Sequence, residues 1–278
     1  MTLLDTAVLR IGYTPDSDDA FNYYAWEHGR VTCAGFGARF ERHHIVELNR
    51  AAMRGTFDVV NVSSVVYPAV ADRYRILSVG TSVGRGYGPV LVSERFQDLA
   101  QLAGRRVAAG GFSTTGAALA RMLSPGIQLV EMPYDEIADA ILAGEVDAGV
   151  MIHEELLFYP EKGLRKVVDL GAAWCERNHL PLPVGLNLVR RDFDVIAARR
   201  IAGACRDSLL WAQAHHEEAC AFAGRFGRGR AATFVTMFSN RDTLCMPADV
   251  RHAMRVLFDQ VAQLGIAPAV EEIEVVDA

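Results

Sequence analysis

Short apolar runs alternate along the chain with segments in which apolar residues have helical spacing. The runs 8–13, 58–62, 105–109 and 147–152 are typical of buried strands, and helices are predicted over 20–28, 46–54, 137–143 and from the caps at 113–115 to about 124. From 196 onward the pattern is mainly helical, over 196–224, 231–239 and 247–264, and the acidic tail 270–278 is expected to be loosely held. Alternating strands and helices predict the α/β class.

Two stretches of the chain, 51–60 and 140–149, resemble each other. Each contains the end of a helix, a Gly, a two-residue spacer, an Asp and an apolar strand. The first strand ends at Ser63 and Ser64, and the second ends next to His153. Because parallel strands present ligand groups just past their carboxyl ends, this repeat predicts two α/β lobes that face a shared cleft. Such units are common, so a chance similarity is the alternative.

The composition excludes several classes of protein. Of 278 residues, 51% are hydrophobic and 22% are charged, which suits a well-buried core rather than disorder. The 28 Lys and Arg against 34 Asp and Glu give a formal net charge of −6 without a basic cluster, so we expect no nucleic-acid partner and no membrane partner. The longest stretch without these residues, 107–120, is too short and too polar to span a bilayer.

The N-terminal residues and the cysteines indicate a compartment. Residues 1–10 contain Asp5 before any basic residue and no apolar core, so no signal peptide is expected. The five cysteines are odd in number, widely spaced and never in a Cys-x-x-Cys motif, a pattern typical of reduced thiols rather than of a disulfide framework or a zinc site. We therefore expect a cytoplasmic protein.

His153 is the strongest candidate for chemistry from the residues alone. It follows the apolar run 148–152, where a buried strand is expected to reach the cleft, and Glu154 and Glu155 come directly after it. Imidazole titrates near neutral pH, so a histidine in this place suits a general base or acid. The alternative is a histidine whose hydrogen bonds are simply satisfied at a strand end.

Ser113, Thr114 and Thr115 form a second candidate site, because they follow the Gly110-Gly111 pair. A Gly-rich turn that opens a helix directs backbone N–H groups and hydroxyls outward, and such groups bind carboxylates or phosphates. The Gly-Lys-Ser/Thr of a P-loop is absent. Ordinary helix capping explains the same residues equally well.

No metal site is predicted from the sequence. Asp16, Asp18 and Asp19 could hold a hard cation, but a turn and a helix N-terminus explain these carboxylates more simply. The adjacent histidine pairs lack the third ligand and the spacing of zinc motifs.

Several motifs then occur together in the order of a known family. They are Gly-Tyr-Thr-Pro-Asp-Ser-Asp-Asp-Ala-Phe at 12–21, the segments 46–50, 83–89 and 113–115, Gly-Glu-Val-Asp-Ala-Gly-Val-Met-Ile-His-Glu at 144–154, and the segments 167–171, 180–185 and 190–192. Through them the chain resembles the menaquinone-biosynthesis family, and within it the 1,4-dihydroxy-6-naphthoate synthases of the futalosine route. The similarity extends from Leu9 to Pro268.

The resemblance implies a two-lobed, periplasmic-binding-protein-like type II fold with a ligand cleft between the lobes. Lobe one is expected over 1–92 and 188–278, and lobe two over 93–187. The chain is expected to leave lobe one after 88–92, past the bend at 84–89, and to return near 188–191.

The resemblance also implies a lyase that converts cyclic dehypoxanthine futalosine into 1,4-dihydroxy-6-naphthoate and dihydroxyacetone. It implies a small-molecule substrate, no metal or organic cofactor, and a monomer or homodimer. His153 matches the proposed general base of the family. The predicted substrate-binding residues are Ser63, Ser64, Ser113, Thr114, Thr115, Asp18, Arg85 and Asn240.

The opening motif departs from the usual Ser-Pro-Cys-Pro-Asn-Asp-Thr-Phe, because Asp16 stands in place of Cys and Asp18 in place of Asn. The added negative charge is unfavourable for an anionic substrate unless a cation such as Arg85 compensates it. Two alternatives to the lyase therefore stay open: a non-catalytic binder of a carboxylate or aromatic acid on the same fold, and a paralogous enzyme with another substrate. The expected lack of a signal peptide counts against an exported binder.

Overall fold

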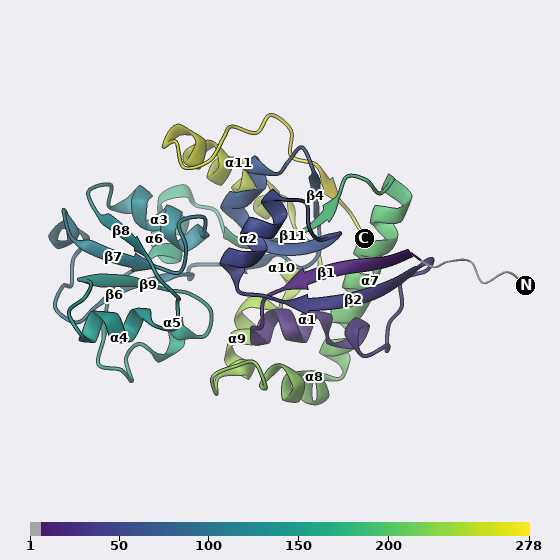
Figure 1. The fold of residues 1–278 in the computed structure, drawn as a ribbon, viewed down its shortest axis with the longest axis horizontal. Coiled ribbons are helices and arrows are strands. Elements are labelled where there is room, and N and C mark those ends of the chain that lie inside the picture. Colours follow the sequence, from purple (N-terminus) through teal and green to yellow (C-terminus); the bar gives the residue numbers. More distant parts are fainter. Residues whose placement is uncertain (1–6) are drawn as a thin grey trace, which may run out of the picture.

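The strands of the protein are divided between two mixed sheets, which lie side by side in the computed structural model (Figure 1). The structure describes residues 7–278. We call the body around the seven-stranded sheet lobe one and the body around the five-stranded sheet lobe two. No helix in residues 7–278 is long and apolar enough to cross a membrane.

Lobe one contains the sheet with strand order β12-β4-β11-β3-β1-β2, in which β5 also pairs with β11. β1 is parallel to β2 and β3, whereas β11 runs antiparallel to β3, β4 and β5. The bounds are β1 Ala7–Tyr13, β2 Phe36–Arg42, β3 Val59–Ser63, β4 Tyr74–Leu77, β5 Ser82–Gly84, β11 Leu182–Arg190 and β12 Val275–Val276. The carboxyl ends of β1 and β3 therefore lie at the same edge of the sheet.

Helices cover both faces of this sheet. α1 packs against α7, α8 and α9, α2 packs against β3, and α11 packs against β11. The bounds are α1 Ser17–Glu27, α2 Ile45–Met53, the 3-10 helix η1 Ser64–Ala69, α7 Val195–Ala214, α8 His216–Ala223, α9 Ala231–Phe238, α10 Arg241–Leu244 and α11 Ala248–Gln263.

Lobe two contains the sheet with strand order β10-β6-β9-β7-β8, in which β9, β7 and β8 are parallel and β6 is antiparallel to β9. The strand bounds are β6 Val90–Ser93, β7 Arg106–Ala109, β8 Gln128–Glu131, β9 Ala148–Met151 and β10 Arg165–Asp169. The helix bounds are the 3-10 helix η2 Leu99–Leu102, α3 Thr115–Leu123, α4 Ile137–Leu142, α5 Glu155–Phe158 and α6 Leu170–Asn178. The end of β9 delivers His153 to the side that faces lobe one.

Sheet membership corrects the two predicted boundaries. β5 ends in lobe one at Gly84 and β6 begins in lobe two at Val90, so the chain crosses at the bend that the Gly-rich segment predicts, and β6 lies wholly in lobe two rather than in 1–92. The return lies before Leu182, not near 188, because all of β11 pairs with strands of lobe one. Both errors arose inside apolar strands, which look alike in either sheet.

The acidic composition of the C-terminal tail predicts that it is loosely held, but the structure shows it fixed to lobe one. β12 pairs in parallel with β4, and the carboxylate of Glu274 accepts hydrogen bonds from Arg75 and Arg191. The side chain of Val276 is buried. Charge pairing and one apolar residue therefore fix a segment that composition alone suggests is free.

The predicted helix 196–224 is interrupted at His215, where the backbone leaves helical geometry with φ −121° and ψ 47°. The imidazole stacks on the Trp211 ring at 3.9 Å between centroids.

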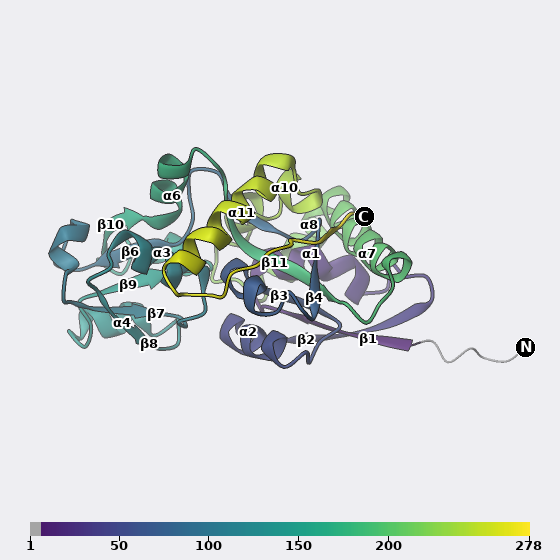
Figure 2. The same cartoon turned by 90° about the horizontal axis from the view of Figure 1, so that it is seen from above.

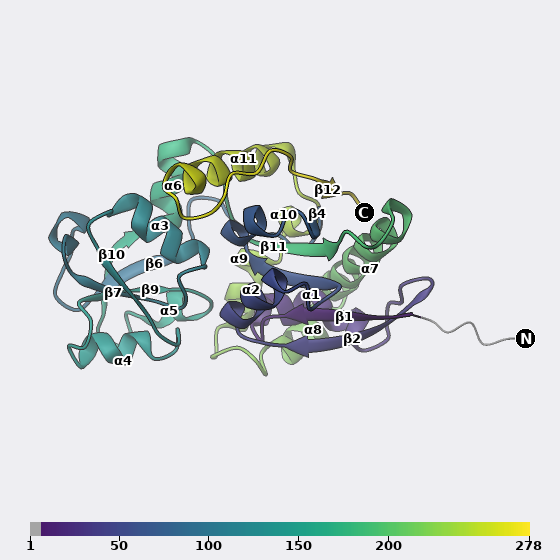
Figure 3. The ribbon, with the colours of Figure 1, turned by 45° about the horizontal axis from the view of Figure 1, so that its top comes forward.

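The helix α11 extends from lobe one toward α6 of lobe two, as Figures 2 and 3 show. The Trp174 indole N–H of α6 donates to Gln260 of α11 at 2.8 Å.

Candidate functional site

A pocket lies where the two lobes meet, and residues of both lobes line it. Lobe one contributes the loop after β1, the end of β3 and parts of β5 and β11, and lobe two contributes the start of α3 and the segment after β9. The polar lining side chains are Thr14, Asp18, Asp19, Asn61, Ser63, Ser82, Thr114, Thr115 and His153, and the apolar ones include Ile45, Ile152, Leu156, Phe234 and Phe238. A mainly apolar cavity with a few convergent polar groups is typical of a small-molecule site.

His153 lies at the inner wall of this pocket, as the strand pattern predicts. Its Nδ1 atom lies 2.6 Å from Oδ2 of Asp16, which belongs to the loop between β1 and α1. Its Nε2 atom is buried and has no hydrogen-bond partner among residues 7–278. The backbone of His153 has a φ of 54°, an uncommon conformation for a residue with a side chain.

Asp16 and His153 shift each other's pKa. Burial lowers the pKa of His153, but the charge and the hydrogen bond of Asp16 raise it by more, so the pKa lies above its usual value. Burial raises the pKa of Asp16, yet the charge of His153 lowers it overall. The two side chains therefore form a buried ion pair across the lobes whenever the imidazole is protonated.

The acidic loop is neutralised locally and not by Arg85. Oδ2 of Asp19 accepts hydrogen bonds from the backbone N–H and hydroxyl of Thr14, and its Oδ1 accepts one from Asn61 at 2.6 Å. Burial, followed by the charges of Asp19 and Asp16, raises the pKa of Asp18 well above its usual value, and burial raises that of Asp19 to about 6. A proton on Asp18 removes much of the expected repulsion toward an anionic ligand.

Ser63 and Ser113 meet through Asn49, which the sequence did not single out. The backbone N–H of Ser63 donates to Asn49 Oδ1 at 3.0 Å, and Asn49 Nδ2 donates to Ser63 Oγ at 3.2 Å and to the Ser113 carbonyl at 3.2 Å. Ser63 lines the pocket, whereas Ser113 and Ser64 do not. Ser64 is buried at the start of η1.

Thr114 and Thr115 lie at the start of α3 and line the pocket. Thr114 is the N-cap, since its hydroxyl accepts from the Ala117 N–H and donates to the Gly111 carbonyl. The Thr115 hydroxyl donates to the carbonyl of Val184 in lobe one at 2.7 Å. Both hydroxyls thus have structural partners. The cap occupies the Ala117 N–H, so the N–H groups of Thr115 and Gly116 are the first-turn groups suited to bind an anion here.

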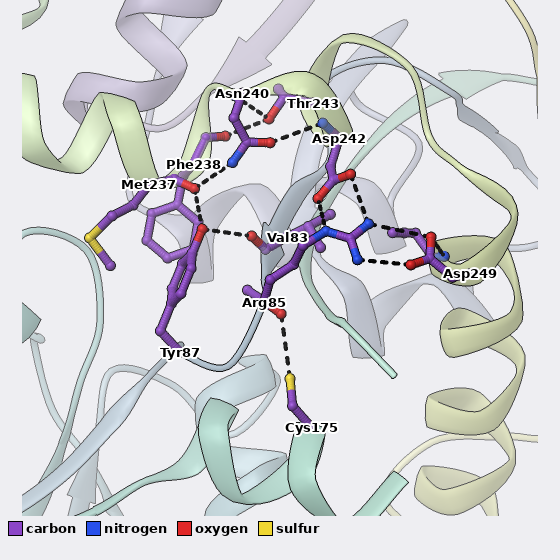
Figure 4. A network of polar contacts seen from close by, with 12 residues as sticks. Val83, Arg85, Tyr87, Cys175, Met237, Phe238, Asn240, Asp242, Thr243 and Asp249 are labelled. Atoms are coloured by element: carbon purple, nitrogen blue, oxygen red, sulfur yellow. Dashed lines mark hydrogen bonds and ion pairs between the residues drawn. The ribbon is translucent and has the colours of Figure 1, made fainter. Parts of the chain in front are cut away.

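Arg85 and Asn240 lie outside the pocket, in a separate surface depression, which corrects the prediction that they face the cleft. Figure 4 shows that the Arg85 guanidinium is shared by Asp242 and Asp249, with Nε–Oδ2 and Nη1–Oδ2 distances of 2.6 and 2.8 Å. Asn240 caps α10 through the Asp242 N–H and donates to the Met237 carbonyl. Their polar atoms are therefore occupied within lobe one.

A second set of contacts crosses between the lobes beside His153. Glu154 is buried and accepts a hydrogen bond from the Ser17 hydroxyl at 2.5 Å and another from the Arg228 N–H at 2.6 Å. The Arg228 guanidinium forms an ion pair with Glu155 and lies over the Tyr134 ring. The Glu154 carboxylate thus joins the end of β9 to two segments of lobe one.

Residues 7–278 contain no group of three or more His, Cys, Asp and Glu side chains placed to hold a metal ion. The aspartates of the opening loop instead bind Thr14, Asn61 and His153. The donor set of the pocket therefore consists of hydroxyls, amides, carboxyls and one imidazole.

Comparisons with known proteins identify the family. A family model described as menaquinone biosynthesis matches residues 9–263. A 1,4-dihydroxy-6-naphthoate synthase of Thermus thermophilus is 41% identical over 211 residues, which cover 76% of each chain. A synthase of the same description from Streptomyces coelicolor is 34% identical over 272 residues, which cover 94% of this chain and 95% of that protein. The chain belongs to the menaquinone-biosynthesis family. Its role is in menaquinone biosynthesis, and the named relatives are enzymes, so the predicted resemblance is confirmed.

Solved structures confirm the predicted fold class. A crystal structure of a protein from Archaeoglobus fulgidus matches with a TM-score of 0.88 and 38% identity, over 95% of this chain and all of that one. The alkanesulfonate-binding protein of Xanthomonas axonopodis pv. citri, bound to MOPS, matches with a TM-score of 0.70 and 14% identity, over 99% and 100% of the two chains. At that identity the likeness shows the periplasmic-binding-protein-like fold alone.

Three residues that help to build the site were not predicted from the sequence as site residues: Asn49, Glu154 and Asp16. Asn49 and Glu154 both lie in the quoted family motifs, but a motif does not say which way a side chain points. In the sequence, Asp16 was one of three carboxylates in a turn and stood in place of the usual Cys, with no partner assigned to it. Its partner, His153, lies 137 positions further along the chain and in the other lobe. A contact of that kind leaves no signal in a single sequence.

Proposed function

We propose that this family member is a lyase that converts cyclic dehypoxanthine futalosine into 1,4-dihydroxy-6-naphthoate and dihydroxyacetone, with His153 as the general base. The observation that carries the proposal is the buried Nε2 atom of His153, which has no partner among residues 7–278 and belongs to a side chain that lines the pocket. The synthases to which the chain is 41% and 34% identical support the choice of reaction.

The start of α3 is the proposed site for the carboxylate of the substrate. Thr115 and Gly116, in the first turn of α3, line the pocket, and an N-terminal helix dipole favours negative charge. A Cβ at position 116 would lie 2.8 Å from the Val150 side chain and 3.2 Å from that of Pro89, so a larger residue there would force these neighbours or the helix to shift. Gly116 therefore lets the N-terminus of α3 pack closely against β9 and Pro89.

The base begins the proposed reaction. Nε2 of His153 takes a proton from a substrate carbon, and the electron pair of that C–H bond forms a new double bond as the carbon–carbon bond to the departing fragment breaks. The departing fragment leaves with the electron pair of the carbon–carbon bond and takes the proton from Nε2. A positioned general base contributes about 10²–10⁴-fold to a rate. The place of the pocket between the lobes supports the same proposal, because a substrate bound there contacts both lobes and is held near the imidazole.

The pocket wall offers neutral polar groups for the substrate hydroxyls. Ser63 and Asn61 line it from lobe one, and Asn61 is held in place by the hydroxyl of Tyr23 and by Asp19. Asp18 lines the pocket as well, in the position where the family usually has Asn. A protonated Asp18 can donate a hydrogen bond as an amide does, which is why the substituted loop is compatible with the proposed substrate.

The test is incubation of the purified protein with cyclic dehypoxanthine futalosine, followed by mass-spectrometric detection of 1,4-dihydroxy-6-naphthoate. Product from the wild type, and at least about a hundredfold less from His153→Gln, supports the lyase and its base. Equal product from both proteins rejects His153 as the base. No product from either, with tight binding of a carboxylate or aromatic acid, favours the non-catalytic binder. Absence of both favours an enzyme with another substrate.

A further inference from the structure

The carboxylate of Asp16 touches the proposed base from the opposite lobe. Asp16 precedes α1 in lobe one, whereas His153 follows β9 in lobe two, and the Nδ1–Oδ2 distance is 2.6 Å. Both side chains are largely buried, with exposures of 16% for His153 and 9% for Asp16. The two residues belong to different lobes and are far apart in the sequence, so their contact depends on how closely the two lobes approach each other.

This contact determines which nitrogen of the imidazole can act as a base. An ionised carboxylate only accepts hydrogen bonds, so the proton of the neutral ring resides on Nδ1 and the lone pair on Nε2. Nε2 is the nitrogen without a partner in residues 7–278. The φ of 54° at His153 adds a second constraint on the direction of the ring.

Other charged and titratable groups also face His153. Asp19 and Arg228 act on its charge from lobe one, Tyr134 packs its ring 4.8 Å away between centroids, and Glu155 lies two positions further on in α5. The Arg228 guanidinium is paired with Glu155, and the Asp19 carboxylate is bonded to Thr14 and Asn61. Asp16 is thus the carboxylate in direct contact with the imidazole.

We propose that Asp16 is a positioning residue that holds His153 in the tautomer and orientation needed for proton abstraction, and that it does so across the cleft. The role of His153 as a base rests on the proposed function, whereas its contact with Asp16 is independent of that function. In the reaction a substrate C–H bond breaks, an Nε2–H bond forms, and the electron pair remains on the substrate. Asp16 stays ionised and stabilises the imidazolium until the proton passes to the departing fragment.

The first test needs no substrate. The imidazole of His153 is titrated by NMR in histidine-labelled protein, with His153→Gln to assign the resonance. Asp16→Asn, which keeps the size of the side chain but removes its charge, is expected to lower the pKa of His153. The matched control is Asp72→Asn, since Asp72 is an exposed carboxylate that forms an ion pair with Arg73. An unchanged pKa of His153 in Asp16→Asn overturns the inference.

The second test uses the reaction. Asp16→Asn is expected to lower kcat about a hundredfold, to change KM less than about threefold, and to move the acid limb of the pH–rate profile toward lower pH. If Asp16→Asn does not fold, Asp16→Cys places the usual residue of the family there and carries the same expectations. A loss of kcat with an unmoved profile indicates a merely structural role and overturns the inference. If the titration shifts as expected and no protein forms product, the proposed function fails and the contact stands.

Discussion

Two networks of aspartates and a cationic partner occupy different places in this protein. In the cleft, Asp16 and His153 come from different lobes, are buried, and leave one ring nitrogen without a partner in residues 7–278. In the surface depression, Arg85, Asp242 and Asp249 all belong to lobe one, and Arg85 is 45% exposed. His153 and Arg85 were both candidate site residues in the sequence, but the structure places His153 in the pocket between the lobes and Arg85 in the separate depression.

The difference lies in which atoms are still available. The Arg85 guanidinium donates its hydrogen bonds to the carboxylates of Asp242 and Asp249, and its hydrogen bond lowers the pKa of Asp249. Such a half-exposed pair adds little stability and offers little to a ligand. The imidazole in the cleft is held at one nitrogen by Asp16, and its other nitrogen is buried without a hydrogen-bond partner among residues 7–278. A buried polar atom without a partner is costly, so it is a better indicator of a site than charge is.

The largest expected effect is on His153. His153→Gln keeps a polar side chain but removes the titratable nitrogen, so kcat is expected to fall by about 10²–10⁴-fold. The measurement is the rate of product formation, with the melting temperature as the control for folding. A variant that retains more than about a tenth of the wild-type rate would contradict the assignment and remove the contrast between the two networks.

An intermediate effect is expected at Glu154. Glu154→Ala leaves the Ser17 hydroxyl and the Arg228 N–H without their shared acceptor, which costs about 2 kcal/mol of unfolding free energy. Because the contact joins the lobes, KM is also expected to rise about tenfold, by more than kcat falls. Denaturant unfolding and steady-state kinetics measure these effects.

Glu154→Gln is the matched control for that variant, since an amide can accept from Arg228 and donate to Ser17. It is expected to restore most of the lost stability and most of the KM. Equal damage in both variants would show that the charge of Glu154, and not the bridge, is what matters.

A smaller effect, on stability, should depend on pH. The pKa of His153 is raised in the folded protein above its usual 6.5. Its contribution to the free energy of unfolding is therefore complete below pH 6.5 and disappears as the pH rises through the pKa of the folded state. The pKa of Asp16 is lowered in the folded protein below its usual 3.8. Its contribution to the free energy of unfolding is therefore complete above pH 3.8 and disappears as the pH falls through the pKa of the folded state. Asp16→Asn should therefore cost the most, about 1 kcal/mol, between pH 3.8 and 6.5. A cost that grows toward alkaline pH in denaturation curves would reverse the sign of the pairing.

The smallest effect on activity is expected at Arg85. Arg85→Met removes both ion pairs but keeps the length of the side chain, so the unfolding free energy should fall by about 1 kcal/mol, and less at high salt. The rate of product formation should stay within about twofold of the wild type. A tenfold loss of rate would place Arg85 in the chemistry and would erase the comparison on which this account rests.

Local signals in the sequence were sufficient for much of the fold. The predicted strand ends put Ser63 and His153 at the pocket, and Thr114 caps its helix as the Gly-rich turn predicts. The tail was misjudged because Glu274 is held by Arg75 and Arg191, which are far away in sequence. Periodicity reports the neighbours of a residue along the chain and not its partners across a sheet.

The same limit applies to the site. Arg85 follows a strand of the predicted cleft region, but its direction is set by Asp242 and Asp249, which lie 157 and 164 positions further along the chain. Asp16 shares its turn with two other aspartates, and only the meeting of the lobes shows which one contacts His153. Residue types could be predicted from the sequence, whereas pairings between lobes could not.

The most direct measurement of the central claim is a crystal structure of the protein with 1,4-dihydroxy-6-naphthoate bound. We expect the product between the lobes, with its carboxylate at the start of α3 beside Thr115 and an atom of its ring system within about 4 Å of His153 Nε2. Product bound only in the depression beside Arg85, or in the cleft with the imidazole turned away from it, would contradict the account.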